Sequence, residues 1–331
     1  MEKRTLGRTG FEVSVLGFGC GAVGGLMVRG APADQERAVA NAVARGVDYF
    51  DTAALYGDGE SERHLGRVLK SLKPDIRVGT KVRVPRVEPG RIGAAIAASL
   101  EASLRRLQRS DLDLFQLHNH ITWDGRDADL TPELVLAEVV PAFERLRREG
   151  KTRAYGITAI GDTAALRRVV DARAFDTAQV SYNMLNPSAG TSVSSGYPAH
   201  DFGSLFAHTA TAAMGVIAIR VLAAGALSGV EARHPVGVPE VEPIGSGSSY
   251  RVDVARARRL APLVEEGFAD SLIEAAIRFA ITDRRVATAL VGTSTLGQLD
   301  EALDAADKGP LPPAALARLA ALQQNFVGDA R

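Results

Sequence analysis

The chain has 331 residues, of which 46% are hydrophobic and 24% charged, as is typical of a globular protein with a sizeable core. Its 39 lysines and arginines balance 39 aspartates and glutamates, so nothing points to a nucleic acid or an anionic membrane as partner. The single cysteine, Cys20, excludes an internal disulfide, and the polar start without any long apolar run predicts a cytoplasmic protein with no signal peptide or membrane span.

Short apolar runs alternate with amphipathic helical patterns from one end of the chain to the other. The segment 5–14, with Gly-Arg-Thr-Gly between extended flanks, predicts a small hairpin ahead of this alternation. Strands are predicted near 13–18, 47–51, 76–81, 112–118, 153–157, 177–182, 215–220 and 286–291. Helices are predicted near 34–45, 61–70, 91–108, 132–149, 162–172, 201–213, 253–282 (a pair), 295–306 and 313–326.

Several helices carry start and stop signals. We expect Asp34 and Ser61 to be N-caps, Pro132 to lie in a first turn, and Gly46 and Gly150 to be C-terminal caps. Eight strand–helix units without a break in composition predict one (β/α)8 TIM barrel domain over residues 1–331, with a doubly wound parallel sheet as the alternative.

Two segments are too long to be simple connections, 184–200 and 224–252. Both follow predicted strands, on the face where barrel enzymes build their sites. We therefore expect them to be site loops, with disorder in the absence of ligand as the alternative.

Residues 19–24, Gly-Cys-Gly-Ala-Val-Gly, match the glycine pattern of a dinucleotide-binding turn. In a Rossmann fold such a turn opens its helix at once, whereas here nine residues, 25–33, separate it from the helix predicted at Asp34. The glycines are better interpreted as a rim loop in which the backbone of Gly19, Cys20 and Gly21 approaches a ligand closely.

Four polar residues follow three consecutive predicted strands. Asp51 ends the second strand, Tyr56 follows it by five residues, and Lys81 and His118 end the third and fourth. The carboxyl ends of all barrel strands open on one rim, so these side chains can converge. A lysine ammonium stabilises phenolate, an aspartate can hold the ammonium, and a histidine can donate to the same oxygen. The group is suited to protonating the alkoxide that forms when hydride reaches a carbonyl carbon.

With this tetrad, and with the segment Asp-Thr-Ala-Ala-Leu-Tyr-Gly at 51–57, the chain resembles the aldo-keto reductases over essentially its whole length. The resemblance implies an NAD(P)-dependent oxidoreductase that interconverts an aldehyde or ketone and an alcohol. It also implies that Tyr56 is the general acid and base, within the catalytic set Asp51, Tyr56, Lys81 and His118.

The resemblance further implies cofactor-binding residues, with departures from the family pattern. Gln179 matches the glutamine that binds the nicotinamide carboxamide, and Thr158 replaces the usual serine. The usual aromatic-Ser-Pro-Leu reads Ile-Arg-Val-Leu at 219–222, so the stacking aromatic is missing. Arg220 is expected to approach the cofactor phosphates or the substrate, with a rim salt bridge as the alternative. The segment 222–229 contains Leu222 and Gly225, and its glycines and backbone suit close contact with a phosphate.

Residues 291–301 match in position the site for the phosphate on the adenine ribose, and here we expect Gly292, Ser294, Gln298 and Glu301 to contact the cofactor. The basic residues frequent at this place in the family are absent. NADP(H) remains favoured by the resemblance, with NAD(H) as the alternative.

The substrate pocket is expected to include Leu55, Tyr56, His118, His120 and Trp123. For His120 a supporting role behind the pocket or a surface role is favoured, and packing against the next helix is the alternative for Trp123. No residues have metal-ligand spacing, so no metal is expected.

A small carbonyl compound or a sugar is the expected substrate, and the sequence does not specify an oligomeric state. The segments 21–27 and 51–62 resemble bacterial aldose dehydrogenases, so a sugar 1-dehydrogenase that forms a lactone is one alternative. Outside this activity, Lys81 could serve a Schiff-base aldolase, or the chain could be a non-catalytic cofactor-binding subunit.

Overall fold

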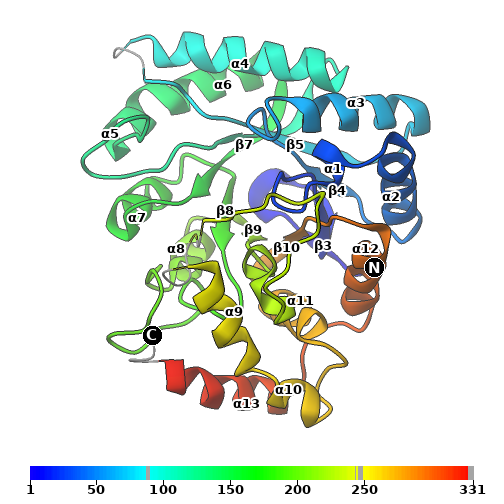
Figure 1. Ribbon diagram of the computed structural model, residues 1–331. Helices are drawn as coiled ribbons and strands as arrows, with labels where there is room; N and C mark the ends of the chain where they lie inside the picture. Colours follow the sequence, from blue (N-terminus) through cyan, green and yellow to red (C-terminus); the bar gives the residue numbers. More distant parts are fainter. Residues whose placement is uncertain (87–89, 243, 245–248, 327–331) are drawn as a thin grey trace.

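The computed structural model describes residues 1–86, 90–242, 244 and 249–326 (Figure 1). Eight parallel strands form a closed barrel in the order β10-β3-β4-β5-β6-β7-β8-β9. They are β3 (Leu16–Gly19), β4 (Tyr49–Asp51), β5 (Arg77–Val82), β6 (Leu112–Leu117), β7 (Thr152–Ala159), β8 (Thr177–Ser181), β9 (Gly215–Ile219) and β10 (Val286–Val291). The closure confirms the (β/α)8 prediction, because a doubly wound sheet would have two open edges.

An antiparallel hairpin, β1 (Lys3–Thr5) and β2 (Glu12–Ser14), precedes the barrel, as predicted, and it covers one end of the barrel. A short 3₁₀ turn, η1 (Gly7–Thr9), joins its strands. Leu6, Phe11 and Val13 are buried with inward residues of the barrel such as Tyr49 and Leu114. This apolar floor closes the amino-terminal end, so a ligand can enter the barrel only from the other end.

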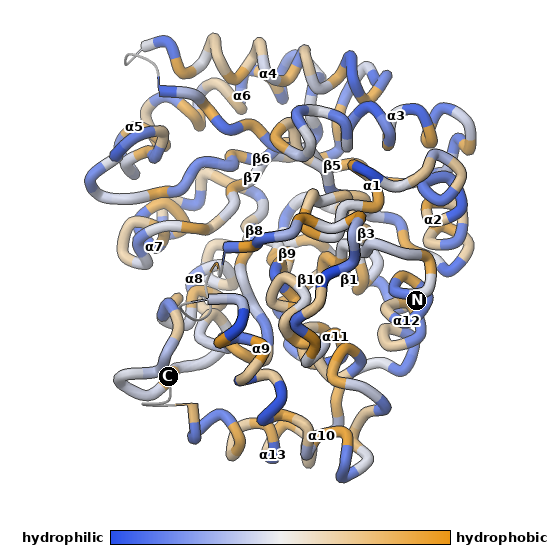
Figure 2. Tube along the Cα trace, viewed as in Figure 1, coloured by the Kyte–Doolittle hydropathy of each residue, from blue (hydrophilic) through white to orange (hydrophobic). Residues whose placement is uncertain are grey.

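Helices surround the barrel, and hydrophilic and hydrophobic residues alternate along them (Figure 2). Apolar side chains between the strands and the helices form the larger core cluster. The helices are α1 (Leu26–Arg29), α2 (Pro32–Ala44), α3 (Glu60–Leu72), α4 (Ile92–Leu107), α5 (Pro132–Leu134), α6 (Val140–Arg148), α7 (Thr163–Asp171), α8 (Leu205–Thr211), α9 (Tyr250–Arg258), α10 (Pro262–Glu265), α11 (Leu272–Thr282), α12 (Leu296–Asp307) and α13 (Pro313–Gln323). A 3₁₀ turn, η4 (Gln324–Phe326), completes the predicted C-terminal helix, and no helix in the described ranges is long and apolar enough to cross a membrane.

Two predicted N-caps are wrong. Helix α2 begins at Pro32, after Ala31, because the fixed φ of proline suits a first helical position, and Asp34 lies inside the first turn. Helix α3 begins at Glu60, and the Ser61 hydroxyl is buried, where it donates to the carbonyl of Cys20 at 2.8 Å. That tertiary contact outweighs the local capping preference.

The glycine stops are confirmed, since Gly46 and Gly150 follow α2 and α6 with φ of 88° and 73°. Pro132 opens α5 as predicted. The helix predicted at 132–149 contains a π-helical turn, η2 (Val135–Val139), in which the Val140 N–H donates to the Val135 carbonyl. Pro141 lacks the N–H that a regular α-helix needs here, which explains the interruption.

Other predicted boundaries also differ. The strand predicted at 13–18 is divided at Val15 between β2 of the hairpin and β3 of the barrel, and the helix predicted at 201–213 is shorter. The predicted pair at 253–282 is three helices, because Pro262 starts α10 and Gly267, at φ 77°, ends that turn. Within the long loop 224–252, residues 243 and 245–248 lie outside the described residues.

Candidate active site

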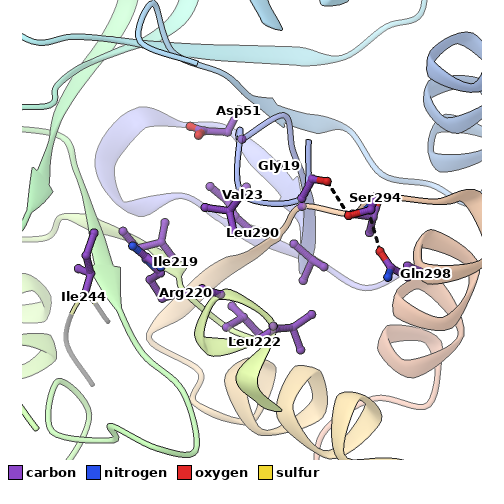
Figure 3. A pocket seen from close by; sticks show the side chains of 18 of the residues that line it. Gly19, Val23, Asp51, Ile219, Arg220, Leu222, Ile244, Leu290, Ser294 and Gln298 are labelled. Carbon is purple, nitrogen blue, oxygen red and sulfur yellow. Dashed lines mark hydrogen bonds between the residues drawn. The ribbon is translucent and has the colours of Figure 1, made fainter. Parts of the chain in front are cut away.

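A cavity of about 380 Å³ opens at the carboxyl ends of the strands (Figure 3). It extends from Tyr56 and His118 to the start of α12, with Ser294 and Gln298 at that far end. Residues of the β3–α1 loop, of β7 and β8, and of the long segment after β9 line it. Its position is the one expected for the site of a (β/α)8 enzyme.

Asp51 and Lys81 form a buried ion pair inside the barrel. The exposed fractions of their side chains are 4% and 0%, and the Lys81 ammonium donates to Asp51 Oδ1 and, at 2.8 Å, to the Thr52 carbonyl. Burial opposes the charge of Lys81, but Asp51 and Tyr56 raise its pKa above the ordinary value. Lys81 is therefore an ammonium at neutral pH.

Tyr56 lies between this pair and the cavity. Lys81 Nζ donates to Tyr56 Oη at 3.3 Å and lies 4.9 Å from the centre of the ring. Lys81 does not line the cavity, whereas Tyr56 does. The ammonium acts on the cavity only through the phenol.

His118 follows β6 directly and lines the cavity beside Tyr56, with 5.9 Å between ring centres in an edge-to-face arrangement. Burial and then the charge of Lys81 lower the pKa of His118 to about 3, so the imidazole is neutral at physiological pH. Its Nδ1 is buried without a hydrogen-bond partner in the described part of the chain. A proton on Nδ1 would be buried unpaired, which favours the tautomer with the proton on Nε2.

Gln179 on β8 and Thr158 on β7 also line the cavity. Gln179 donates through Nε2 to Asp51 Oδ2 at 2.6 Å, which leaves the amide oxygen for a ligand. The Thr158 hydroxyl is buried and has no partner among the described residues. An unpaired buried hydroxyl in a ligand cavity is the kind of group that a bound molecule would satisfy.

The loop between β3 and α1 combines two uses of glycine. A Cβ on Gly24 would lie 2.7 Å from the backbone N and O of Thr293, so this glycine permits close packing on the β10–α12 loop. A Cβ on Gly21 would instead lie 3.9 Å from Cε2 of Tyr56, an ordinary contact distance, and Gly21 lines the cavity, as does Gly19. The Cys20 side chain is 1% exposed in the apolar core, and Cys20 does not line the cavity.

At the far end of the cavity, the polar groups of Ser294 are engaged within the protein. Its hydroxyl donates to the Gly24 carbonyl at 2.6 Å, and its N–H donates to Gln298 Oε1 at 2.8 Å. Gly292 and Glu301 line the same end. The arginines that line the cavity, Arg220 and Arg233, are both on the segment after β9.

The segment after β9 runs into a 3₁₀ turn, η3 (Ala223–Ser228), and has an unusual backbone. Arg220, Ala223 and Ala224 have φ of 57°, 46° and 59°, the left-handed region that favours glycine, and Gly225 has φ of 106°. The cavity is lined here by Ile219, Arg220, Leu222 and Gly225. An aliphatic side chain, that of Ile219, therefore stands where the family usually has an aromatic one.

Three residues expected in the substrate pocket lie outside this cavity. Leu55 and Trp123 are 51% and 50% exposed, and His120 is 3.8 Å from the carboxylate of Asp129. Sequence reasoning missed other lining residues that come from the long loop, such as Arg233, His234, Ile244 and Tyr250. The glycine and proline content of that loop marked it as irregular but carried no signal for these side chains.

No group of three or more metal-binding side chains occurs in the described part of the chain. The polar groups gathered here are instead an ammonium, a phenol, a neutral imidazole and an amide. This set is suited to moving one proton and polarising one oxygen.

The chain belongs to the aldo/keto reductase family, whose model matches residues 15–324, and it is an oxidoreductase. L-galactose dehydrogenase of Arabidopsis thaliana is 28% identical over 306 residues, which cover 91% of this chain and 86% of the relative. D-threo-aldose 1-dehydrogenase of a Pseudomonas species is 32% identical over 212 residues, 56% of this chain and 62% of the relative.

Solved structures of aldo-keto reductases also match this chain over nearly its whole length. The holo form of the aldo-keto reductase AKR11C1 from Bacillus halodurans superposes with a TM-score of 0.71 at 26% identity, and the match covers 99% of this chain and 96% of that one. Its apo form gives 0.69 at 27% identity, with 97% and 96% covered.

Proposed function

We propose that this enzyme is an NAD(P)-dependent oxidoreductase that interconverts an aldehyde or ketone and an alcohol, with Tyr56 as the general acid and base. The observation that carries the proposal is the chain of contacts from Asp51 through Lys81 to the Tyr56 hydroxyl, which ends at the cavity. No other ammonium in the described structure is held in this way behind a cavity-lining phenol.

The geometry of these contacts supports transfer of the phenolic proton toward the cavity. Because Lys81 donates to Tyr56 Oη, the phenolic proton is free to point into the cavity toward a substrate oxygen. When the proton leaves, the same ammonium stabilises the phenolate. In the opposite direction the phenolate takes the proton from an alcohol. Asp51 keeps Lys81 charged and in place through both directions.

His118 would polarise the same substrate oxygen. Its neutral imidazole can donate from Nε2, and an uncharged donor leaves the proton transfer itself to Tyr56. Neutral histidine also adds no second positive charge beside Lys81, whose own charge helps to lower the His118 pKa.

The residues that line the cavity fit a dinucleotide. The elongated cavity, the unpaired Thr158 hydroxyl and the available Gln179 amide oxygen suit a nicotinamide end, while Gly225 and Gly292 allow backbone approach further along. When bound, the cofactor supplies or accepts the hydride. The protein residues orient the two reactants, exclude water and move the proton.

Charge at the far end of the cavity supports NAD(H) as the preferred cofactor, in place of the NADP(H) that the resemblance alone favours. The Ser294 N–H is already bonded to Gln298, and the residues expected to contact the phosphate, Gly292, Ser294, Gln298 and Glu301, include an acid and no base. A 2′-phosphate carries about two negative charges, and none of these four residues would balance them.

A sugar substrate oxidised at C1 to a lactone is a second candidate. Two relatives are named as sugar dehydrogenases, L-galactose dehydrogenase and D-threo-aldose 1-dehydrogenase, and the second name specifies position 1. The same phenolate would take the proton from the anomeric hydroxyl. A Schiff-base aldolase is disfavoured because Lys81 is a paired, buried ammonium without direct access to the cavity.

The Tyr56→Phe variant tests the proposal. Because it removes the transferable proton and little else, we expect kcat to fall by about 10²- to 10⁴-fold while the Kd for NADH or NADPH stays unchanged. Turnover of a panel of aldehydes and aldoses, with cofactor binding by calorimetry, measures both. Tyr155→Phe, a buried tyrosine between the barrel and its helices, is the control. Full activity in Tyr56→Phe would refute the mechanism.

A further inference from the structure

We propose that Arg220 binds a carboxylate on the substrate, so that the enzyme acts on small aldehydes, ketones or alcohols that carry an acid group. The inference rests on the proposed function, since it names the substrate class for the same cavity. Its basis is a half-buried guanidinium that lines the cavity and has no partner in the described structure.

The contrast with Arg233 shows what is unusual about Arg220. Arg233 also lines the cavity, but it donates to the carbonyls of Val238, Ala224 and Val23 and lies 5.1 Å from the centre of the Tyr250 ring. The Arg220 guanidinium forms no hydrogen bond or ion pair with any described residue. Its five N–H donors are available to a ligand.

The backbone holds Arg220 in a strained conformation. Its φ of 57° lies in the left-handed region, which is unfavourable for a residue with a side chain. The Arg220 carbonyl accepts hydrogen bonds from Asn183 Nδ2 at 2.9 Å and from the Ala223 N–H at 2.7 Å, which fix this conformation. Two hydrogen bonds that maintain a strained residue beside a cavity indicate a functional reason for its placement.

Arg220 lies at the reacting end of the cavity and not at its far end. Figure 3 places Arg220 and Ile244 on one side of the cavity, and Ser294 and Gln298 on the other. Tyr56 is among the groups that act electrostatically on Arg220. A guanidinium at this place can bind the part of a substrate that extends away from the carbonyl under Tyr56 and His118.

The surrounding charges favour a ligand with a single negative charge. Burial lowers the pKa of Arg220, and the influence of Tyr56, Glu242 and Asp253 opposes this only in part. A carboxylate would neutralise the Arg220 guanidinium and match its planar fork with two parallel hydrogen bonds. A phosphate would bring excess negative charge near Glu242 and Asp253.

A matched pair of aldehydes tests the inference: 4-oxobutanoate carries a carboxylate, and butanal has the same carbon chain without it. We expect kcat/KM to be about 30-fold or more higher for 4-oxobutanoate, since removing one member of a buried charge pair has an effect of that size. In Arg220→Gln the ratio of the two kcat/KM values should approach one, because the loss falls on 4-oxobutanoate. Arg220→Lys should retain part of it, because the charge stays and the fork is lost.

Other results would overturn the inference. Equal kcat/KM of the wild type for the two aldehydes would overturn it. Weaker cofactor binding in Arg220→Gln, with both aldehydes equally affected, would also overturn it, because Arg220 would then be a ligand of the cofactor. Arg251→Gln, an 83% exposed arginine on the same long segment, controls for the loss of one charge.

A binding experiment separates this inference from the proposed function. Calorimetry with butanoate and butanamide needs no turnover, and binding of butanoate that Arg220→Gln abolishes supports the carboxylate site even if neither aldehyde reacts. Absence of butanoate binding overturns it. Failure of NADH and NADPH to bind, measured separately, would instead refute the proposed function.

Discussion

At the scale of single residues, the site separates charges that stay fixed from groups that act on the ligand. Lys81 and Asp51 are buried behind Tyr56, so packing keeps water away from both charged groups. Breaking such a buried pair typically costs about 3–5 kcal/mol because one charge is left uncompensated. The pair therefore positions Tyr56 and also contributes to the rigidity of the barrel at the rim.

The low pKa of His118, about 3, predicts a specific pH dependence of stability. Below pH 6.5 the unfolded chain takes up a proton on this residue and the folded chain does not, so the free energy of unfolding should fall as pH decreases toward 4. The expected loss is about 1.4 kcal/mol per pH unit.

His118→Gln should lack this contribution. Urea unfolding of both proteins at pH 7.5 and pH 5 measures it as a change in their stability difference. A difference that is the same at both pH values would contradict the lowered pKa of His118.

The sequence predicted the positions of Asp51, Tyr56, Lys81 and His118, because consecutive parallel strands must end on the same rim. It could not predict that Leu55 and Trp123 would be exposed outside the cavity, since loop conformation decides this. The role of Ser61 was also hidden, because its partner, the Cys20 carbonyl, is distant in sequence.

At the scale of elements, the loops after β3 and β10 pack together to form one wall of the cavity. Gly24 allows this contact, and the Leu26 N–H donates to the Thr293 carbonyl at 3.2 Å. The glycine motif that resembles a dinucleotide turn is thus explained in part by packing between two rim loops. A sequence pattern cannot distinguish close approach to a ligand from close approach to another loop.

Gly24→Ala should lower the free energy of unfolding by about 1–3 kcal/mol, because the new methyl group would overlap the Thr293 backbone. It should also weaken cofactor binding, since Thr293 and Ser294 line the cavity. Thermal unfolding and calorimetric titration with NADH measure the two effects.

Gly297→Ala, in the first turn of α12, is the matched control. No atom lies within 4 Å of a Cβ there, and alanine is the better helix former by about 1 kcal/mol, so stability should stay the same or rise. Equal behaviour of the two variants would contradict the packing argument.

At the scale of the whole molecule, the two ends of the barrel have different tasks. The hairpin and Leu6 close the amino-terminal end, while the cavity occupies the carboxyl end. The alternation of strands and helices predicted this architecture because each of the eight strand–helix units carries its own hydrophobic pattern. Boundaries such as the π-helical turn before Pro141 were missed, since one residue decides them.

Leu6→Ala should therefore reduce stability without changing catalysis. Leu6 is fully buried, and its truncation should cost about 2–5 kcal/mol, whereas kcat and cofactor Kd of the folded enzyme should be unchanged. Thr5→Ala, an exposed neighbour, should leave both stability and activity near the wild-type values. A lower kcat in Leu6→Ala would show that the floor influences the site.

The burial of Cys20 has a practical consequence. Burial raises the pKa of this thiol, the only one in the chain, and packing keeps reagents from its Sγ. Alkylation of this thiol would therefore not report cofactor occupancy. An exposed Cys20 on the rim, as predicted, would have allowed such an assay. The native enzyme therefore has no thiol that reacts readily with labelling reagents. A cysteine introduced at Val236, beside the β3–α1 loop, could carry a spectroscopic label that reports on the long loop.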